Sequence, residues 1–188
     1  MDELELRAWL RFSRLEISPA VGRALVDCFG SPQAVFDAAE SDLRRIDRVT
    51  DNVVAKILGP VPAAIENDLK LIERLNVTLL PISSEDYPPN LKHIYDPPVL
   101  LYVRGRLLES DKMSIAIVGS RRAGEYGLSI ARKLARDLAS KGLAIVSGGA
   151  RGIDTAAHQG ALEAGGRTVA FLGSGIDVNY PPENRRLF

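Results

Sequence analysis

Three short glycine-rich segments contain the residue types that can bind a phosphate group. They share glycine with arginine or a small hydroxyl residue, and they are Gly119-Ser120-Arg121-Arg122-Ala123-Gly124, Gly148-Gly149-Ala150-Arg151-Gly152-Ile153-Asp154 and Gly173-Ser174-Gly175-Ile176-Asp177. Glycine permits positive φ angles and lets backbone N–H groups come close to an anion. Arg121 and Arg151 add permanent charge and forked donors that match phosphate oxygens. The chemistry that these segments indicate is anion binding.

Each glycine-rich segment follows an apolar run with the composition of a buried strand. The predicted strands are 114–118, 143–147 and 168–172, with amphipathic helices predicted over 126–140 and 153–164. This alternation indicates a parallel sheet with both faces covered, the Rossmann-like doubly wound α/β fold class. Because the carboxyl ends of parallel strands share one edge, the three turns are expected to line one pocket beside free helix N-termini.

The turns do not match the common nucleotide-binding fingerprints. Arg121 stands where the Gly-x-Gly of an NAD or FAD site requires glycine, and Val178 stands where the last glycine of the third turn would be. The sequence has no Gly-Lys-Ser/Thr, which excludes a P-loop ATPase site. We therefore expect no nucleotide cofactor of these kinds, and indeed no cofactor.

Asp154 and His158 are four residues apart on one predicted helix and could pair as a general base. Asp154 lies early in the helix, where a carboxylate commonly caps or orients a turn, and this is the role we assign to it. No second carboxylate, cysteine or lysine accompanies the pair at motif spacing. The sequence therefore predicts no catalytic residue and no enzyme. With only Cys28 and two histidines, it also predicts no metal site.

Charge is distributed unevenly along the chain although the total is zero. Residues 1–103 hold 11 Lys/Arg against 16 Asp/Glu, whereas residues 104–151 hold 10 against 4. Such a basic block is a plausible electrostatic footprint for phosphate. The alternative is that several of its cations only solvate the outer face of a helix. These are Arg132, Lys133, Arg136 and Lys141.

Residues 1–60 are predicted to form a small all-helical domain, and Gly59-Pro60-Val61-Pro62 separates it from a second domain over 61–188. The pattern helix, tight turn, helix occurs around 18–22 and 47–51, as in tandem helix-hairpin-helix units. A phosphate-binding hairpin needs small residues, but the first turn keeps only Gly22 and the second has no glycine. A protein-contact or structural role is therefore favoured over DNA contact.

Other features place the chain in a reducing cytoplasm. The N-terminus is acidic, unlike a secretory signal, and no apolar run approaches the roughly 18 to 20 residues that cross a bilayer. No membrane partner is expected. Since the sequence stops just after its third strand and turn, while doubly wound sheets usually have five or more strands, we expect a C-terminally truncated form of a longer protein.

The motifs together resemble those of the DNA-processing protein DprA family, also called Smf. The resemblance is carried by Tyr87-Pro88-Pro89-Asn90-Leu91, Asp96-Pro97-Pro98-Val99-Leu100, Ile117 to Arg121, Ser147 to His158, Leu172 to Asp177 and Tyr180-Pro181. It covers roughly residues 65–188, and the helical front part is similar to the variable, SAM-like domain of that family. Many members also carry a C-terminal winged helix, which we expect to belong to the part missing from this truncated form.

The resemblance implies a single-stranded-DNA-binding protein of natural transformation, which protects incoming strands and loads the RecA recombinase. It also implies a homodimer formed through the Rossmann-like domain. Carried over to this sequence, the phosphate-binding residues are Gly119, Ser120, Arg121, Gly148, Gly149, Arg151, Gly173, Ser174 and Gly175. The family is similar to phosphoribohydrolases, so a nucleotide-cleaving enzyme or a small-nucleotide sensor stays as the alternative, although the Pro-Gly-Gly-x-Gly-Thr segment of those enzymes is absent.

Aromatic residues that could stack on bases are scarce near the turns. The candidates are Tyr126, Phe171 and Tyr180. We interpret Tyr126, at the start of a helix, as a packing residue. For Tyr180, in the loop beyond the third turn, packing and base contact are equally favoured.

Overall fold

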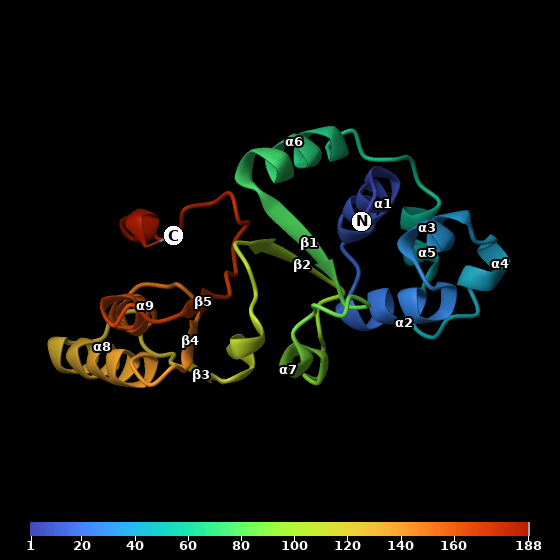
Figure 1. Cartoon of the computed structure of the whole chain (residues 1–188). Helices are drawn as coiled ribbons and strands as arrows, with labels where there is room; N and C mark the ends of the chain where they lie inside the picture. Colours follow the sequence, from blue (N-terminus) through green and yellow to red (C-terminus); the bar gives the residue numbers. More distant parts are fainter. Residues whose placement is uncertain (188) are drawn as a thin grey trace. The chain divides into compact units, whose positions relative to one another are not determined.

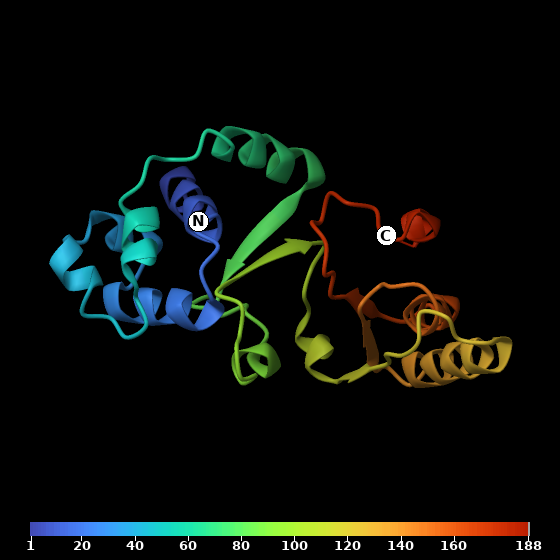
Figure 2. The same ribbon diagram turned by 180° about the vertical axis from the view of Figure 1, so that it is seen from behind.

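A computed structural model describes residues 1–187 of the chain. Its contacts divide them into two compact units, the first Met1–Arg106 and the second beginning at Leu107. Figure 1 and Figure 2 show the elements of both units from opposite sides. Within the described residues, no helix is both long enough and apolar enough to span a membrane.

The first unit is mainly helical. Its elements are α1 (Glu3–Ser13), α2 (Pro19–Phe29), α3 (Pro32–Asp37), α4 (Glu40–Leu43), α5 (Asp51–Ile57), α6 (Ile65–Leu75), β1 (Val77–Pro81), α7 (Pro89–Lys92) and β2 (Leu100–Arg104). Side-chain caps set several helix starts, because a hydroxyl or carboxylate accepts an N–H that the helix itself leaves without a partner. Ser18 and Ser31 do so at α2 and α3, each followed by proline at the first helical position.

The two strands of this unit pair antiparallel, with Val77 opposite Arg104, and lie side by side in both views (Figures 1 and 2). Ile65, Leu79 and Leu100 share one buried core with the front helices, including Trp9 and Phe12. The compact units therefore divide after residue 106, whereas the sequence places the domain division after residue 60. The reason is that α6 and the strand pair supply apolar surface to the core of the front helices.

The glycine of the first helix-hairpin-helix-like turn is engaged in packing. Gly22 is buried, and a Cβ at this position would lie 3.4 Å from the Phe12 ring. Its N–H already donates to the carbonyl oxygen of Ser18 at 2.9 Å. This glycine therefore serves helix packing, which agrees with a structural role for the front region.

Tyr87 ties the two proline motifs of the first unit together. The buried Tyr87 hydroxyl donates a 2.7 Å hydrogen bond to the carbonyl oxygen of Pro98. Burial raises the pKa of this hydroxyl to about 12, so it remains a donor at all ordinary pH values. The Tyr-Pro and Asp-Pro-Pro segments thus have a structural function in this unit.

The second unit contains the parallel sheet. Its elements are η1 (Glu109–Lys112), β3 (Ser114–Ala116), α8 (Glu125–Ala139), β4 (Ala144–Ser147), α9 (Ile153–Glu163), β5 (Thr168–Ala170) and η2 (Pro182–Arg186). The strands lie in the order β3-β4-β5, with Ile145 paired to Ile115 on one side and to Thr168 on the other. This arrangement confirms the α/β class and the strand and helix positions expected from the sequence.

Both helices of this unit cover the same face of the sheet. Ile145 of β4 shares a buried cluster with Ala135 of α8 and Ala157 of α9. This follows from the sequential strand order, because two right-handed crossovers in the same direction place both helices on one side. The sequence predicted helices on both faces, whereas α8 and α9 of the second unit both lie on one face. Val118 and Phe171, which follow β3 and β5, are 71% and 44% exposed.

Helices α8 and α9 approach each other through small residues, and they run side by side in Figures 1 and 2. Ala131, Ala135 and Ala139 form the buried stripe of α8. At Gly160 of α9 the fit is so close that a Cβ would lie less than 3.0 Å from the backbone carbonyl oxygen of Arg132. The two helices are therefore in backbone contact, which makes the separation between them a fixed dimension of the unit.

Candidate functional site

The first glycine-rich turn is an exposed loop between β3 and α8. Gly119, Ser120 and Arg121 are all exposed, and Ser120 Oγ accepts a hydrogen bond from the N–H of Arg122 at 3.1 Å. Gly119 packs against Ile153, where a Cβ would lie 2.7 Å from the nearest side-chain atom. Within the part of the chain that the structure describes, the Arg121 guanidinium has no hydrogen bond or ion pair, so it is available to a ligand.

The second turn packs directly against the first. The N–H of Ile153 donates to the carbonyl oxygen of Ser120 at 3.2 Å. Gly152 has φ +80°, and a Cβ there would lie less than 3.0 Å from the same oxygen. Glycine is required at this position both for its backbone conformation and for the close approach. The structure therefore brings Gly119, Ser120 and Arg121 together with the Gly148 to Gly152 segment, two of the three turns predicted to lie at one edge of the sheet.

Asp154 stabilises the second turn through its buried carboxylate. Its buried carboxylate accepts a hydrogen bond from the N–H of Ala150 at 3.3 Å. A Cβ on Gly148 would lie 2.8 Å from the same carboxylate, so the glycine makes room for it. No side-chain cap is formed at the start of α9 among the described residues. These contacts support an orienting role for Asp154 rather than a helix-capping one.

Asn184 and Thr155 fasten the same turn, and sequence reasoning missed both. The Asn184 amide donates to the carbonyl oxygen of Gly149 at 3.0 Å and to Thr155 Oγ1 at 2.8 Å. The Thr155 hydroxyl in turn donates to the carbonyl oxygen of Ala150 at 2.7 Å. Asn184 lies 35 residues from Gly149 and is buried. No local sequence pattern predicts such a contact, because it depends on where the C-terminal η2 segment packs.

Arg151 has an internal partner. Its guanidinium lies 3.0 Å from the Glu183 carboxylate, and its central carbon lies 5.8 Å from the centroid of the Tyr180 ring. The backbone N–H of Glu183 and the Arg151 side chain both lower the pKa of Glu183, so this carboxylate is ionised at neutral pH. A phosphate that binds Arg151 must therefore displace or share a carboxylate.

The third turn is linked to the second through the β4–β5 ladder. The N–H of Phe171 donates to the carbonyl oxygen of Ser147 at 2.9 Å, which places the end of β5 beside the start of the second turn. Gly173 and Gly175 are exposed and Ser174 is half-buried. The N–H of Val178 donates to the carbonyl oxygen of Gly175 at 2.9 Å and closes the turn. No hydrogen bond joins Gly173, Ser174 or Gly175 to the first turn in the described residues.

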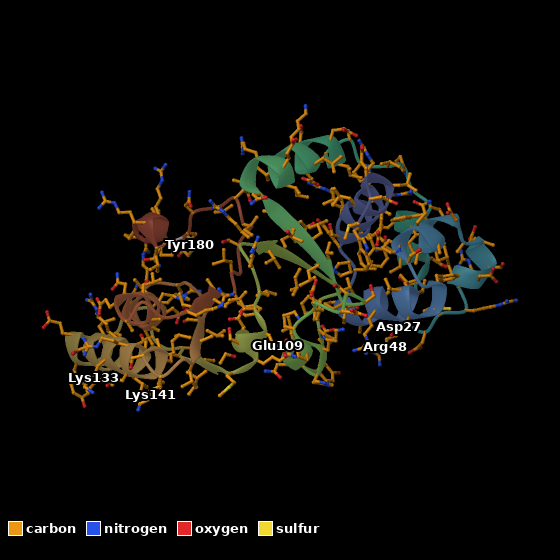
Figure 3. All side chains as sticks on the ribbon, viewed as in Figure 1. Asp27, Arg48, Glu109, Lys133, Lys141 and Tyr180 are labelled. Atoms are coloured by element: carbon orange, nitrogen blue, oxygen red, sulfur yellow. The ribbon has the colours of Figure 1, made fainter. Side chains whose placement is uncertain are left out.

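Tyr126 does not pack as expected, since it is 82% exposed. The buried stripe of α8 runs through Ala131, Ala135 and Ala139, and extending it back by one turn reaches Gly127 rather than Tyr126. Phe171 and Tyr180 are 44% and 47% exposed. All three aromatic side chains near the turns therefore present ring surface to solvent, and Figure 3 shows Tyr180 in the segment beyond β5.

Asp154 and His158 have separate partners. His158 is buried, and its Nδ1 lies 2.6 Å from Oγ1 of Thr168 on β5, whose hydroxyl also lies 2.8 Å from the carbonyl oxygen of Ile145. Asp154 faces Ala150 instead. Burial lowers the pKa of His158, and the charge of Asp154 opposes this only in part. The imidazole is thus a neutral element of the core at neutral pH.

Lowering the pH below about 6.5 is expected to destabilise the second unit through His158. The unfolded chain takes up a proton on His158 near that pH, whereas the folded chain resists protonation. Because the unfolded state then binds more protons, the free energy of unfolding decreases as the pH is lowered. Above about pH 6.5 this loss is absent. Urea denaturation between about pH 5 and about pH 8 checks it. His158→Asn should flatten this slope, His93→Asn should keep it, and a slope unchanged in His158→Asn would contradict the assignment.

The fold and this arrangement define a Rossmann-like α/β protein whose glycine-rich turns gather at the carboxyl edge of a parallel sheet. The chain belongs to the family of DNA recombination-mediator protein A, whose model matches residues 78–188.

Similar proteins agree with this family. "Protein Smf" of Synechocystis sp. is 33% identical over 199 residues, covering 100% of this chain and 49% of the relative. "DNA processing protein DprA" of Streptococcus pneumoniae is 46% identical over 106 residues, covering 56% of this chain and 37% of the relative. The crystal structure of DNA processing protein A (DprA) from Streptococcus pneumoniae matches with a TM-score of 0.70 and 30% identity, covering 97% of this chain and 62% of that one. The chain thus spans about half or less of these curated relatives.

Proposed function

We propose that the chain binds single-stranded DNA, and that it acts in natural transformation by protecting incoming strands and loading the RecA recombinase. Membership of a family described as a DNA recombination mediator supports the recombination role. The observation that carries the binding proposal is the exposed Gly119-Ser120-Arg121 turn. Its arginine is available, and it packs directly on the second glycine-rich turn.

The physical mode is a sequence-tolerant contact with the sugar-phosphate backbone. Backbone N–H groups and Arg121 bind phosphate oxygens, while exposed rings at Phe171, Tyr126 and Tyr180 offer stacking surface without reading base identity. Asp154, Thr155 and Asn184 keep the second turn in shape through hydrogen bonds to its backbone. Such a site binds any strand, as a protein that handles incoming DNA must.

A non-enzymatic role is part of the proposal. Asp154 and His158, which carry the acid–base potential noted in the sequence, are each engaged in contacts that hold the fold. Within residues 1–187 no group of three His, Cys, Asp or Glu side chains is placed to hold a metal ion. Contact with RecA and dimerisation through the Rossmann-like domain follow from the family resemblance.

Fluorescence anisotropy with labelled oligo-dT of increasing length tests the proposal. We expect affinity that rises with length and falls steeply with salt, because phosphate contacts release counterions with a slope of about −0.7 per contact for single strands. Duplex DNA and a mononucleotide serve as competitors. Both should compete poorly.

The competitor experiment separates this proposal from the alternatives. A mononucleotide that binds saturably at an affinity comparable to that of the oligonucleotide would replace the proposal by a nucleotide enzyme or sensor. Equal binding of duplex and single strand would remove the preference for single strands. Binding of neither would overturn DNA binding by this chain.

A further inference from the structure

A basic groove runs over the outer surface of α8 and α9 and reaches η2. It encloses about 660 Å3 and is lined by four cations, Arg132, Lys133, Arg136 and Arg151, against two carboxylates, Glu125 and Glu183. The charged side chains of the lining are mostly cations, which suits a polyanion. For the three cations of α8, the sequence alone did not decide between phosphate binding and simple solvation of a helix face.

The cations of α8 are accessible. Arg132 pairs with Glu163 across the two helices, and Lys133 Nζ lies 2.6 Å from Asp137. Arg136 has only a distant contact, 3.9 Å from its Nε to Asp137. Figure 3 shows Lys133 projecting from α8. Exposed ion pairs of this kind add little stability in water, so a phosphate group can exchange with the carboxylates.

The groove continues from the second glycine-rich turn. Arg151 and Gly152 belong to that turn and also line the groove. Arg132 and Arg136 lie one turn apart on α8, about 6 Å along the helix axis, so their charges extend the path away from the turns. Because Gly160 holds α9 in backbone contact with α8, the fold fixes the spacing of the two helices that contribute to the groove.

We propose that this groove binds the sugar-phosphate backbone of the same DNA strand beyond the glycine-rich turns, which makes Arg132 and Arg136 a second phosphate-binding segment. The inference rests on the proposed function, since it extends the path of the strand. The proposal thus gives a ligand to the cations of the basic block that lie outside the glycine-rich turns. Strands too short to leave the turns do not reach the groove.

The test is the double variant Arg132→Gln/Arg136→Gln, in which glutamine retains part of the apolar stem. We expect affinity for a dT strand of about 16 nucleotides to fall at least tenfold, and that for a strand of about 4 nucleotides to stay unchanged. The slope of log K against log salt for the long strand should drop by about 1.4, since two phosphate contacts are lost. Lys112→Gln/Lys141→Gln removes the same charge from the same unit outside the groove and should leave both affinities unchanged.

Three outcomes would overturn the inference. Unchanged long-strand affinity in Arg132→Gln/Arg136→Gln, while Arg121→Ala weakens binding, would leave the proposed function standing without the groove. An equal loss for short and long strands would place the effect at the turns, through Arg151, and not along an extended path. A matching loss in the Lys112→Gln/Lys141→Gln control would reduce the effect to net charge. If Arg121→Ala also has no effect, the proposed function itself fails.

Discussion

Gly160→Ala is expected to loosen or unfold the second compact unit. The added methyl would lie within 3.0 Å of the carbonyl oxygen of Arg132 and 3.1 Å from Cβ of Ala135. Because the obstructing oxygen belongs to the backbone of α8, no side-chain rotation relieves the collision and the helices must separate. Overpacking costs about 1–3 kcal/mol or more, against a total stability of about 5–15 kcal/mol for a domain. The melting temperature should fall on the order of 10 °C.

Gly127→Ala is the matched control, since it makes the same chemical change in the first turn of the neighbouring helix. A Cβ at Gly127 would meet Ala123 and Ile153 at 3.6 Å, which is ordinary contact. This variant should gain about 0.5–1 kcal/mol from helix propensity. Thermal melts and hydrogen exchange of the α8 and α9 amides give the comparison. Similar shifts in the two variants would show that the helices are not in backbone contact at Gly160.

Arg121→Ala/Arg151→Ala is expected to produce the largest loss of DNA binding. Hydrogen bonds to charged groups are worth about 1.5–3 kcal/mol each, so the pair should cost about 3–6 kcal/mol, or roughly 10²- to 10⁴-fold in affinity. Removing Arg151 also leaves the ionised carboxylate of Glu183 beside the turns without its partner. That carboxylate then repels the incoming phosphate, which adds to the loss.

A third substitution isolates the contribution of Glu183. Adding Glu183→Gln to Arg121→Ala/Arg151→Ala should restore part of the affinity, and Glu183→Gln alone should strengthen binding several-fold, because Arg151 is then available to phosphate. Titrations with labelled oligo-dT at two salt concentrations give these values, with Arg45→Ala in the first unit as a charge-matched control for a single lost arginine. If the Arg121/Arg151 double variant binds DNA as tightly as the original chain, the turns are not the phosphate site.

Much of the second unit could be predicted from the sequence, because its signals are local. Apolar strands with a glycine-rich turn after each one indicate a parallel sheet, and the structure has β3, β4 and β5 within the predicted runs. The closeness of the first and second turns was also predictable, because the carboxyl ends of parallel strands share one edge of the sheet. The spacing of four between Ala131, Ala135 and Ala139 in the sequence is also a signal for a small-residue stripe that allows close helix packing.

Other features depend on contacts between distant parts of the chain, and no local pattern predicts them. The sequence of α6 does not show which of the two domains the helix packs against. The core that Ile65, Leu79 and Leu100 share with the front helices shows that α6 belongs to the first unit. Asn184 docks on Gly149 across 35 residues. The pairing of Arg151 with Glu183 likewise depends on the position of η2, so the sequence alone could not show that this phosphate-binding candidate has an internal competitor.

The sequential order β3-β4-β5 has a consequence for how the protein forms. Each strand pairs with the one made just before it, and each helix packs on strands that are already next to it in the chain. Each pairing therefore closes only one βαβ unit, which costs less loop-closure entropy than an order that skips a strand. During synthesis the second unit can assemble strand by strand, which shortens the time for which its apolar strands are exposed as unpaired edges.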